Sequence, residues 1–164
     1  MSQKEQDFSK LVKENQGLII KVARMYTNTP DDQQDLFQEI VLQLWRSYDT
    51  FKGNSKISTW MYRVALNTAI TLFRKTTRTV KTDELADFHQ PIDDENDENQ
   101  QQIALLYKVI KMLGDIDRAI VMMYLDDVPY KDIAENIGIT EVNARVKMNR
   151  LKKTLKDLMT QHAE

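Results

Sequence analysis

The sequence contains no cysteine and few of the other residues from which catalytic and metal sites are usually built. Without cysteine there can be no disulfide framework, thiolate nucleophile or cysteine-ligated zinc. The two histidines, His89 and His162, are far apart in the sequence, so a histidine metal site or a catalytic triad lacks its imidazoles. Four scattered glycines leave no Walker loop and no dinucleotide-binding fingerprint. We therefore predict that the chain is not an enzyme and needs no metal or cofactor.

Long hydrophobic runs are also missing. The longest, residues 119–125, has seven residues, whereas a membrane-spanning helix needs about 20. The first residues, Met-Ser-Gln-Lys-Glu-Gln-Asp, lack the apolar core of a signal peptide. With 164 residues, 41% of them hydrophobic, the chain can form one domain or two small ones with packed cores. These features predict a soluble, cytoplasmic protein without membrane insertion.

Charge divides the chain into three parts. Residues 1–81 carry net charge +5, residues 82–102 carry −8 with no basic residue, and residues 103–164 carry +1. The acidic part cannot bury enough apolar surface to order itself, so we expect it to be a flexible linker. The predicted organisation is an N-terminal domain at 1–80, an acidic linker at 81–102 and a C-terminal domain at 103–164.

Both domains are expected to be helical, because apolar residues recur at spacings of three and four and no strand-like alternation competes. Thr29 followed by Pro30 is typical of a helix start, and Ser58 is a candidate N-cap for the helix after it. Gly138 separates a short helix from a long basic one, which is a helix-turn-helix layout. The fold class is therefore all-α, a helical bundle followed by a helix-turn-helix domain. The expected helices are about 5–27, 30–48, 58–77, 101–113, 115–125, 129–137 and 141–160.

The last helix has a basic side. At about 100° per residue, an apolar sector lies opposite a stripe made of Arg145, Asn149, Lys152, Lys153 and Lys156. A helix of this kind fits the major groove, where its first residues reach base edges and its later lysines neutralise phosphates. The alternative is an ordinary solvated, lysine-rich face.

The helix expected after Ser58 places a tryptophan beside polar and basic residues, namely Trp60, Arg63, Asn67, Thr71, Arg74 and Arg78. An aromatic plate, an amide and guanidinium groups are the means by which proteins hold unpaired bases. The alternative is that the tryptophan packs against a neighbouring helix.

The helix after Pro30 has an outward side that combines acids with an apolar residue, namely Asp35, Gln38, Glu39, Leu42 and Arg46. An exposed leucine among acids favours a protein-binding surface, and a solvated acidic face is the alternative.

The order of these motifs resembles the bacterial sigma factors, and the small extracytoplasmic-function class in particular. The resemblance covers residues 8–78 and 103–160. It is carried by Asp35-Leu36-Phe37-Gln38-Glu39, Lys52-Gly53-Asn54-Ser55, Ser58-Thr59-Trp60-Met61-Tyr62-Arg63-Val64-Ala65-Leu66-Asn67, Arg74-Lys75, Tyr130-Lys131-Asp132-Ile133-Ala134 and Arg150-Leu151-Lys152-Lys153-Thr154-Leu155. Thr71 stands where that class often has aspartate, and Asn149 and Leu151 also depart from its pattern. These departures leave the promoter sequence open.

The resemblance implies a role for each match, as parts of a transcription initiation factor that directs core RNA polymerase to promoters. Asp35, Gln38, Glu39 and Leu42 would bind the clamp helices of the polymerase's largest subunit. Melted minus-ten bases would be held by Trp60, Tyr62, Arg63, Asn67 and Arg74. The minus-thirty-five duplex would be read by Arg145, Asn149, Arg150, Lys152 and Lys153. An anti-sigma factor is a further partner compatible with the class.

Two other functions fit the basic helix. A stand-alone helix-turn-helix repressor or activator would bind duplex DNA as a dimer through residues 129–156, and an RNA-binding adaptor would use the same basic faces. A stand-alone repressor has no need of the acidic side of the helix after Pro30 or of a tryptophan beside Asn67, so these two features discriminate against it.

Overall fold

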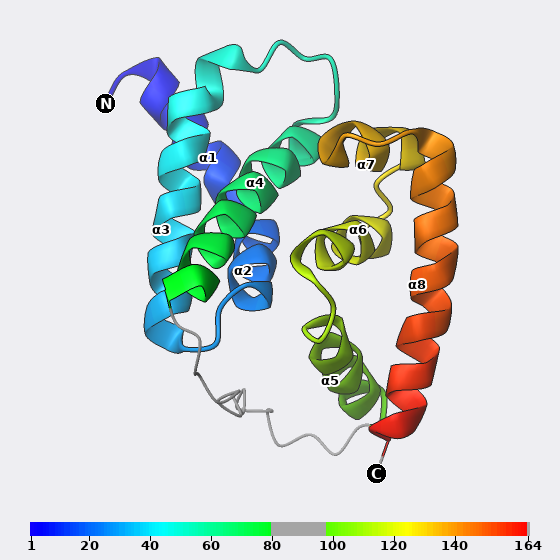
Figure 1. Cartoon of the computed structure of the whole chain (residues 1–164). Helices are drawn as coiled ribbons and strands as arrows, with labels where there is room; N and C mark the ends of the chain where they lie inside the picture. Colours follow the sequence, from blue (N-terminus) through cyan, green and yellow to red (C-terminus); the bar gives the residue numbers. More distant parts are fainter. Residues whose placement is uncertain (80–97, 164) are drawn as a thin grey trace. The chain divides into compact units, whose positions relative to one another are not determined.

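The computed structural model describes residues 1–79 and 98–163, without the side chains of residues 76–79. The chain divides into two compact units, Met1–Ala86 and Asp87–Glu164. Every regular element in the described ranges is helical (Figure 1). The expected all-α fold is confirmed. The prediction of a flexible acidic linker falls largely on residues outside the described ranges.

The first unit is built from α1 (Gln3–Glu14), α2 (Gln16–Met25), α3 (Pro30–Ser47), the 3-10 turn η1 (Tyr48–Thr50) and α4 (Ile57–Thr79). Helices α2, α3 and α4 pack against one another around fully buried Ile19, Ile40 and Met61. Helix α1 joins through Phe8, whose ring meets the Trp45 ring edge to face at 5.1 Å between centroids. This packing determines which sides of α3 and α4 face outward.

Three helix boundaries in the N-terminal unit are set by local hydrogen bonds. Thr29 caps α3 by accepting a hydrogen bond from the Asp32 amide at 3.1 Å, as the Thr-Pro signal predicted. The single helix expected at 5–27 is instead two, because the Asn15 side-chain amide donates to the Leu11 carbonyl and ends α1. Ser58 is not an N-cap. Trp60 N already donates to the Lys56 carbonyl, so α4 begins at Ile57 and Ser58 lies inside it.

The second unit contains α5 (Glu98–Ile110), α6 (Asp115–Leu125), α7 (Tyr130–Ile137) and α8 (Glu141–Gln161). Helix α8 packs against the other three, and its buried residues Ala144, Met148, Leu151 and Leu155 follow the predicted apolar side. Gly138 adopts φ 83°, the left-handed conformation that glycine allows, and turns the chain from α7 into α8. Helix α5 starts three residues before the expected boundary, with Glu98 in its first turn, where a carboxylate is favoured.

Arg118 ties α6 to the end of α5. Its guanidinium is buried, and one Nη donates to the carbonyls of Lys111 at 2.6 Å and Leu113 at 3.1 Å. These carbonyls lie just after the last turn of α5, where the helix supplies no further backbone donors. Arg118 therefore donates to acceptors that the end of a helix leaves unpaired. Burial, together with the nearby Arg118 charge, lowers the pKa of Lys111.

We expect Arg118→Met to destabilise the second unit by about 3 kcal/mol, because the part-buried carbonyls of Lys111 and Leu113 would lose charge-assisted hydrogen bonds. Hydrogen exchange of the full chain measures this unit by unit, and amides of α5, α6 and α8 should lose protection while those of α2–α4 keep theirs. Arg150→Met, at an exposed position of α8, is the control and should change little. Equal protection in the two variants would contradict the structural role of Arg118.

Within the described ranges, none of the helices has the length and apolar character needed to cross a membrane.

Candidate nucleic-acid and protein interfaces

The exposed side of α8 carries the residues predicted to read duplex DNA. Arg145, Asn149, Arg150, Lys152 and Lys153 are all exposed, opposite the buried side of the helix. Thr140 caps the helix by accepting from the Asn143 amide at 3.1 Å, which fixes where the first turn begins. The sequence-based placement of these five side chains on an unburied side agrees with the structure.

Two tyrosines, at the end of α6 and the start of α7, hold two of these cations. The Arg145 guanidinium carbon lies 5.1 Å from the centre of the Tyr130 ring, and Lys152 Nζ lies 4.6 Å from that of Tyr124. Hydrogen bonding to the Tyr124 side chain raises the pKa of Lys152. Arg145 also pairs with Glu141 at 2.9 Å, one turn earlier in α8. These contacts orient Arg145 and Lys152 along one edge of the α8 face.

The first half of that face also carries two exposed apolar side chains, which the pattern of basic residues did not predict. Val142 is 68% exposed and Val146 41% exposed, one turn apart in the first half of α8. The signal was present in the sequence, since both valines fall outside the apolar sector that packs against the rest of the unit.

The polar side of α4 presents the predicted single-strand residues. Arg63, Asn67, Thr71 and Arg74 are exposed, and Trp60 is half-buried on the same side. The Thr71 hydroxyl donates to the Asn67 carbonyl at 2.7 Å, so it is engaged with its own helix. The Asn67 amide stands on an exposed stretch between Arg63 and Arg74.

Trp60 has a structural partner as well as an exposed part. Its ring lies 5.3 Å from the ring of Phe51, at an interplanar angle of 44°. Phe51 begins the loop that runs to α4 and contains Gly53, which has φ 77°. The tryptophan therefore anchors this loop while a smaller part of its surface remains accessible. Phe51 was missed in the sequence, although it is the apolar residue next to the Lys-Gly-Asn-Ser motif.

The structure does not support the role predicted for Tyr62 in holding melted bases. Its side chain is only 2% exposed, and it lies among the buried residues of α4 with Met61 and Leu66. At about 100° per residue, Tyr62 stands on the opposite side of α4 from Trp60, so helical geometry alone would have assigned it to the core. A base-contacting role is not retained for it.

The acidic side of α3 is exposed as predicted at three of its four residues. Asp35 and Gln38 are exposed, and Leu42 is 39% exposed. Glu39 is half-buried and accepts a hydrogen bond from the Gln43 amide at 3.0 Å. Asp31 and Asp32 are exposed in the first turn and extend the acidic surface to the start of α3.

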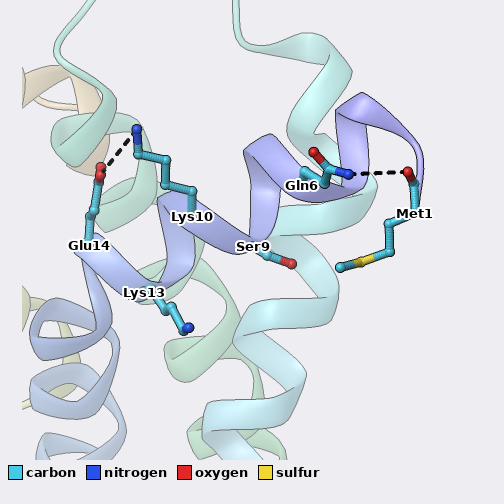
Figure 2. A pocket seen from close by; sticks show the side chains of 6 residues that line it. All are labelled: Met1, Gln6, Ser9, Lys10, Lys13 and Glu14. Atoms are coloured by element: carbon cyan, nitrogen blue, oxygen red, sulfur yellow. Dashed lines mark hydrogen bonds and ion pairs between the residues drawn. The ribbon is translucent and has the colours of Figure 1, made fainter.

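A hollow along α1 does not have the features of a small-molecule site. The hollow drawn in Figure 2 lies along α1 and holds a single ion pair, Lys10 with Glu14 at 3.9 Å. Its lining is exposed and offers no buried polar group to orient a ligand. No group of three His, Asp or Glu residues in the described part could hold a metal ion. The hollow is lined by Met1, Gln6, Ser9, Lys10, Lys13 and Glu14.

A helix-turn-helix with a cationic second helix, following a separate helical unit with a tryptophan-containing polar face, is typical of a DNA-binding protein. Residues 11–79 match the family described as Sigma-70 region 2, and residues 103–155 match Sigma-70, region 4. The chain belongs to the sigma-70 family, in its extracytoplasmic-function class.

Individual relatives agree with this assignment. The chain is 28% identical to the ECF RNA polymerase sigma factor SigW of Bacillus subtilis, over 77% of each protein. A shorter match to the ECF sigma factor SigG of Mycobacterium tuberculosis is 42% identical over 45 residues, so this chain spans only 12% of that relative's length. The fold is similar to the sigma factor RpoE of Bartonella quintana, solved in complex with the anti-sigma factor NepR. The TM-score is 0.78 at 19% identity, covering 94% of this chain and 98% of the other.

Proposed function

We propose that this chain binds core RNA polymerase and directs it to specific promoters. The second unit reads the minus-thirty-five duplex with the exposed side of α8, and the first unit captures melted minus-ten bases with the polar side of α4. The chain itself makes or breaks no bond. The observation that carries the proposal is the presence of both faces on separately packed units, with the acidic side of α3 exposed on the same unit as the α4 face.

The proposed partners follow from the chemistry of each face. The acidic side of α3, with Leu42 exposed within it, fits a basic protein surface such as the polymerase clamp helices. The cationic side of α8 fits promoter duplex. An anti-sigma factor is a further proposed partner, supported by a similar fold solved with one bound.

Run-off transcription on fragmented genomic DNA, with purified core polymerase from the same organism, tests the proposal. We expect defined new transcripts only when the protein and the core enzyme are both present. A stand-alone repressor would instead bind duplex DNA without polymerase and add no transcript, and that result would overturn the proposed function.

The cations of α8 should divide into two kinds. Arg145→Ala should reduce discrimination between cognate and scrambled duplex by about 5- to 150-fold, since one bidentate arginine–guanine contact is worth about 1–3 kcal/mol. Lys156→Ala should weaken binding to both duplexes alike and flatten the salt dependence, because it acts on phosphates. Titrations at several salt concentrations measure both effects.

Lys108→Ala, at an exposed lysine of α5, is the charge-matched control for this comparison and should leave discrimination unchanged. If Arg145→Ala and Lys156→Ala alter cognate and scrambled binding in the same proportion, the division between base-reading and phosphate-binding cations is wrong.

A further inference from the structure

Two exposed valines of α8 lie outside the buried side of their helix. In α8, the side chain of Val142 is 68% exposed and that of Val146 is 41% exposed. Valine is also a poorer helix former than alanine, because its branched side chain loses rotamer freedom in a helix. Helix formation therefore does not account for valine at these positions.

Cations on both sides of the valines indicate what covers them. Taking Val142 as the reference and about 100° per residue, Val146 lies within about 40° of it. Arg145 lies about 60° to one side, and Arg150 about 80° to the other. Both arginines are exposed, and Glu141, one turn before Arg145 in α8, is paired with Arg145. An apolar strip between two cationic edges is complementary to a polyanion that carries apolar groups between its phosphates.

We propose that Val142 and Val146 contact the C5-methyl groups of thymines in the major groove of the duplex bound by α8. This proposal rests on the proposed function and deepens it. The thymine methyl is the apolar feature that the major groove presents, beside the hydrogen-bonding edges that arginine and asparagine read. Duplex DNA also supplies groups for the flanking arginines, a guanine edge for Arg145 and phosphates for Arg150.

Spacing limits which thymines the valines can reach. Residues four apart in a helix are separated by about 6 Å along its axis, and base pairs by about 3.4 Å. The two methyl groups therefore belong to base pairs at most about two steps apart. Arg145 stands between the valines along the helix and is oriented by Glu141 and Tyr130. The expected site is thymine close to a guanine that Arg145 contacts.

Thymine-to-uracil replacement tests the proposal, because it removes the methyl group and leaves every hydrogen-bonding group in place. The full chain, bound to core polymerase, first selects duplexes from a randomised library. Each thymine of the selected minus-thirty-five segment is then changed singly to uracil, and affinity is measured. We expect a three- to fivefold loss at one or two neighbouring positions, the effect of one buried methyl group.

The same series with Val142→Ala and Val146→Ala completes the test. At the thymine that each valine contacts, uracil should no longer weaken binding by that variant, which is the signature of direct coupling. Alanine favours helix, so α8 should be preserved in both variants. Ile103→Ala is the control, since Ile103 is 52% exposed on α5 and should leave the uracil effect intact.

Each other outcome overturns a defined claim. If no duplex is enriched, the proposed promoter recognition fails. If a duplex is enriched but uracil has the same effect, or none, in parent and valine variants, the thymine contact is wrong and the proposed function stands. If the valine variants bind core polymerase more weakly with unchanged duplex affinity, the valines belong to a protein interface and the thymine contact is equally wrong.

Discussion

Reversal of charge at Asp35 and Glu39, both to lysine, is expected to weaken binding to core RNA polymerase at least tenfold. Asp35 is exposed on the outward side of α3, and Glu39 lies beside it one turn later. Placing like charges against a basic partner surface costs several kilocalories per mole and slows association. The fold should persist, because a lysine at position 39 can still donate to the Gln43 amide oxygen, and Asp35 contributes no buried contact.

A competition assay measures this affinity. Each variant displaces a fluorescently labelled sigma factor from core enzyme, and the change in fluorescence reports the displacement. The matched control is Asp7→Lys with Glu14→Lys, two exposed acids of α1 whose reversal changes net charge equally. Circular dichroism checks that helix content is unchanged in both double variants. If the α3 variant binds core enzyme as tightly as the α1 variant does, the acidic side of α3 is a solvated face and not a polymerase-binding surface.

Trp60→Ala and Asn67→Ala are expected to impair promoter opening while core-enzyme binding and closed-complex formation are largely retained. Loss of base stacking on the tryptophan should cost about 1–3 kcal/mol per base, which corresponds to about 5- to 150-fold. The Asn67 amide offers both a donor and an acceptor to a base that has left the stack. Extrusion of a base costs a few kilocalories per mole, so an open complex without these contacts should be poorly populated.

Permanganate footprinting of unpaired thymines measures opening directly. Because Trp60 also packs against Phe51, Trp60→Phe is needed beside Trp60→Ala, and it should keep the loop anchored and recover part of the opening. Asn28→Ala, at an exposed asparagine before α3, is the control for Asn67→Ala. Normal footprints in both alanine variants, with unchanged circular dichroism, would make the Trp60 side of α4 structural.

The faces of single helices were predictable because they depend on a period of 3.6 residues. The buried positions of α8 and the exposed positions of α3 follow directly from that spacing. The two mistakes at helix ends arose from local hydrogen bonds that several residues could make. Asn15 ends α1 through its own side chain, and Lys56 supplies the first acceptor of α4 in place of Ser58. Tyr62 was misplaced where a motif was followed instead of the helical period.

By itself, the sequence determined the all-helical class, the helix-turn-helix at Gly138 and the sides of each helix that avoid the core, because these depend on residues close together in the chain. Only the tertiary structure decided which side chains from different segments meet. It set Trp60 against Phe51, and Arg145 and Lys152 over the tyrosines that flank the α6–α7 loop. It also left Val142 and Val146 uncovered. Such contacts depend on how helices pack, and packing sums many weak interactions between residues distant in sequence that no local pattern records.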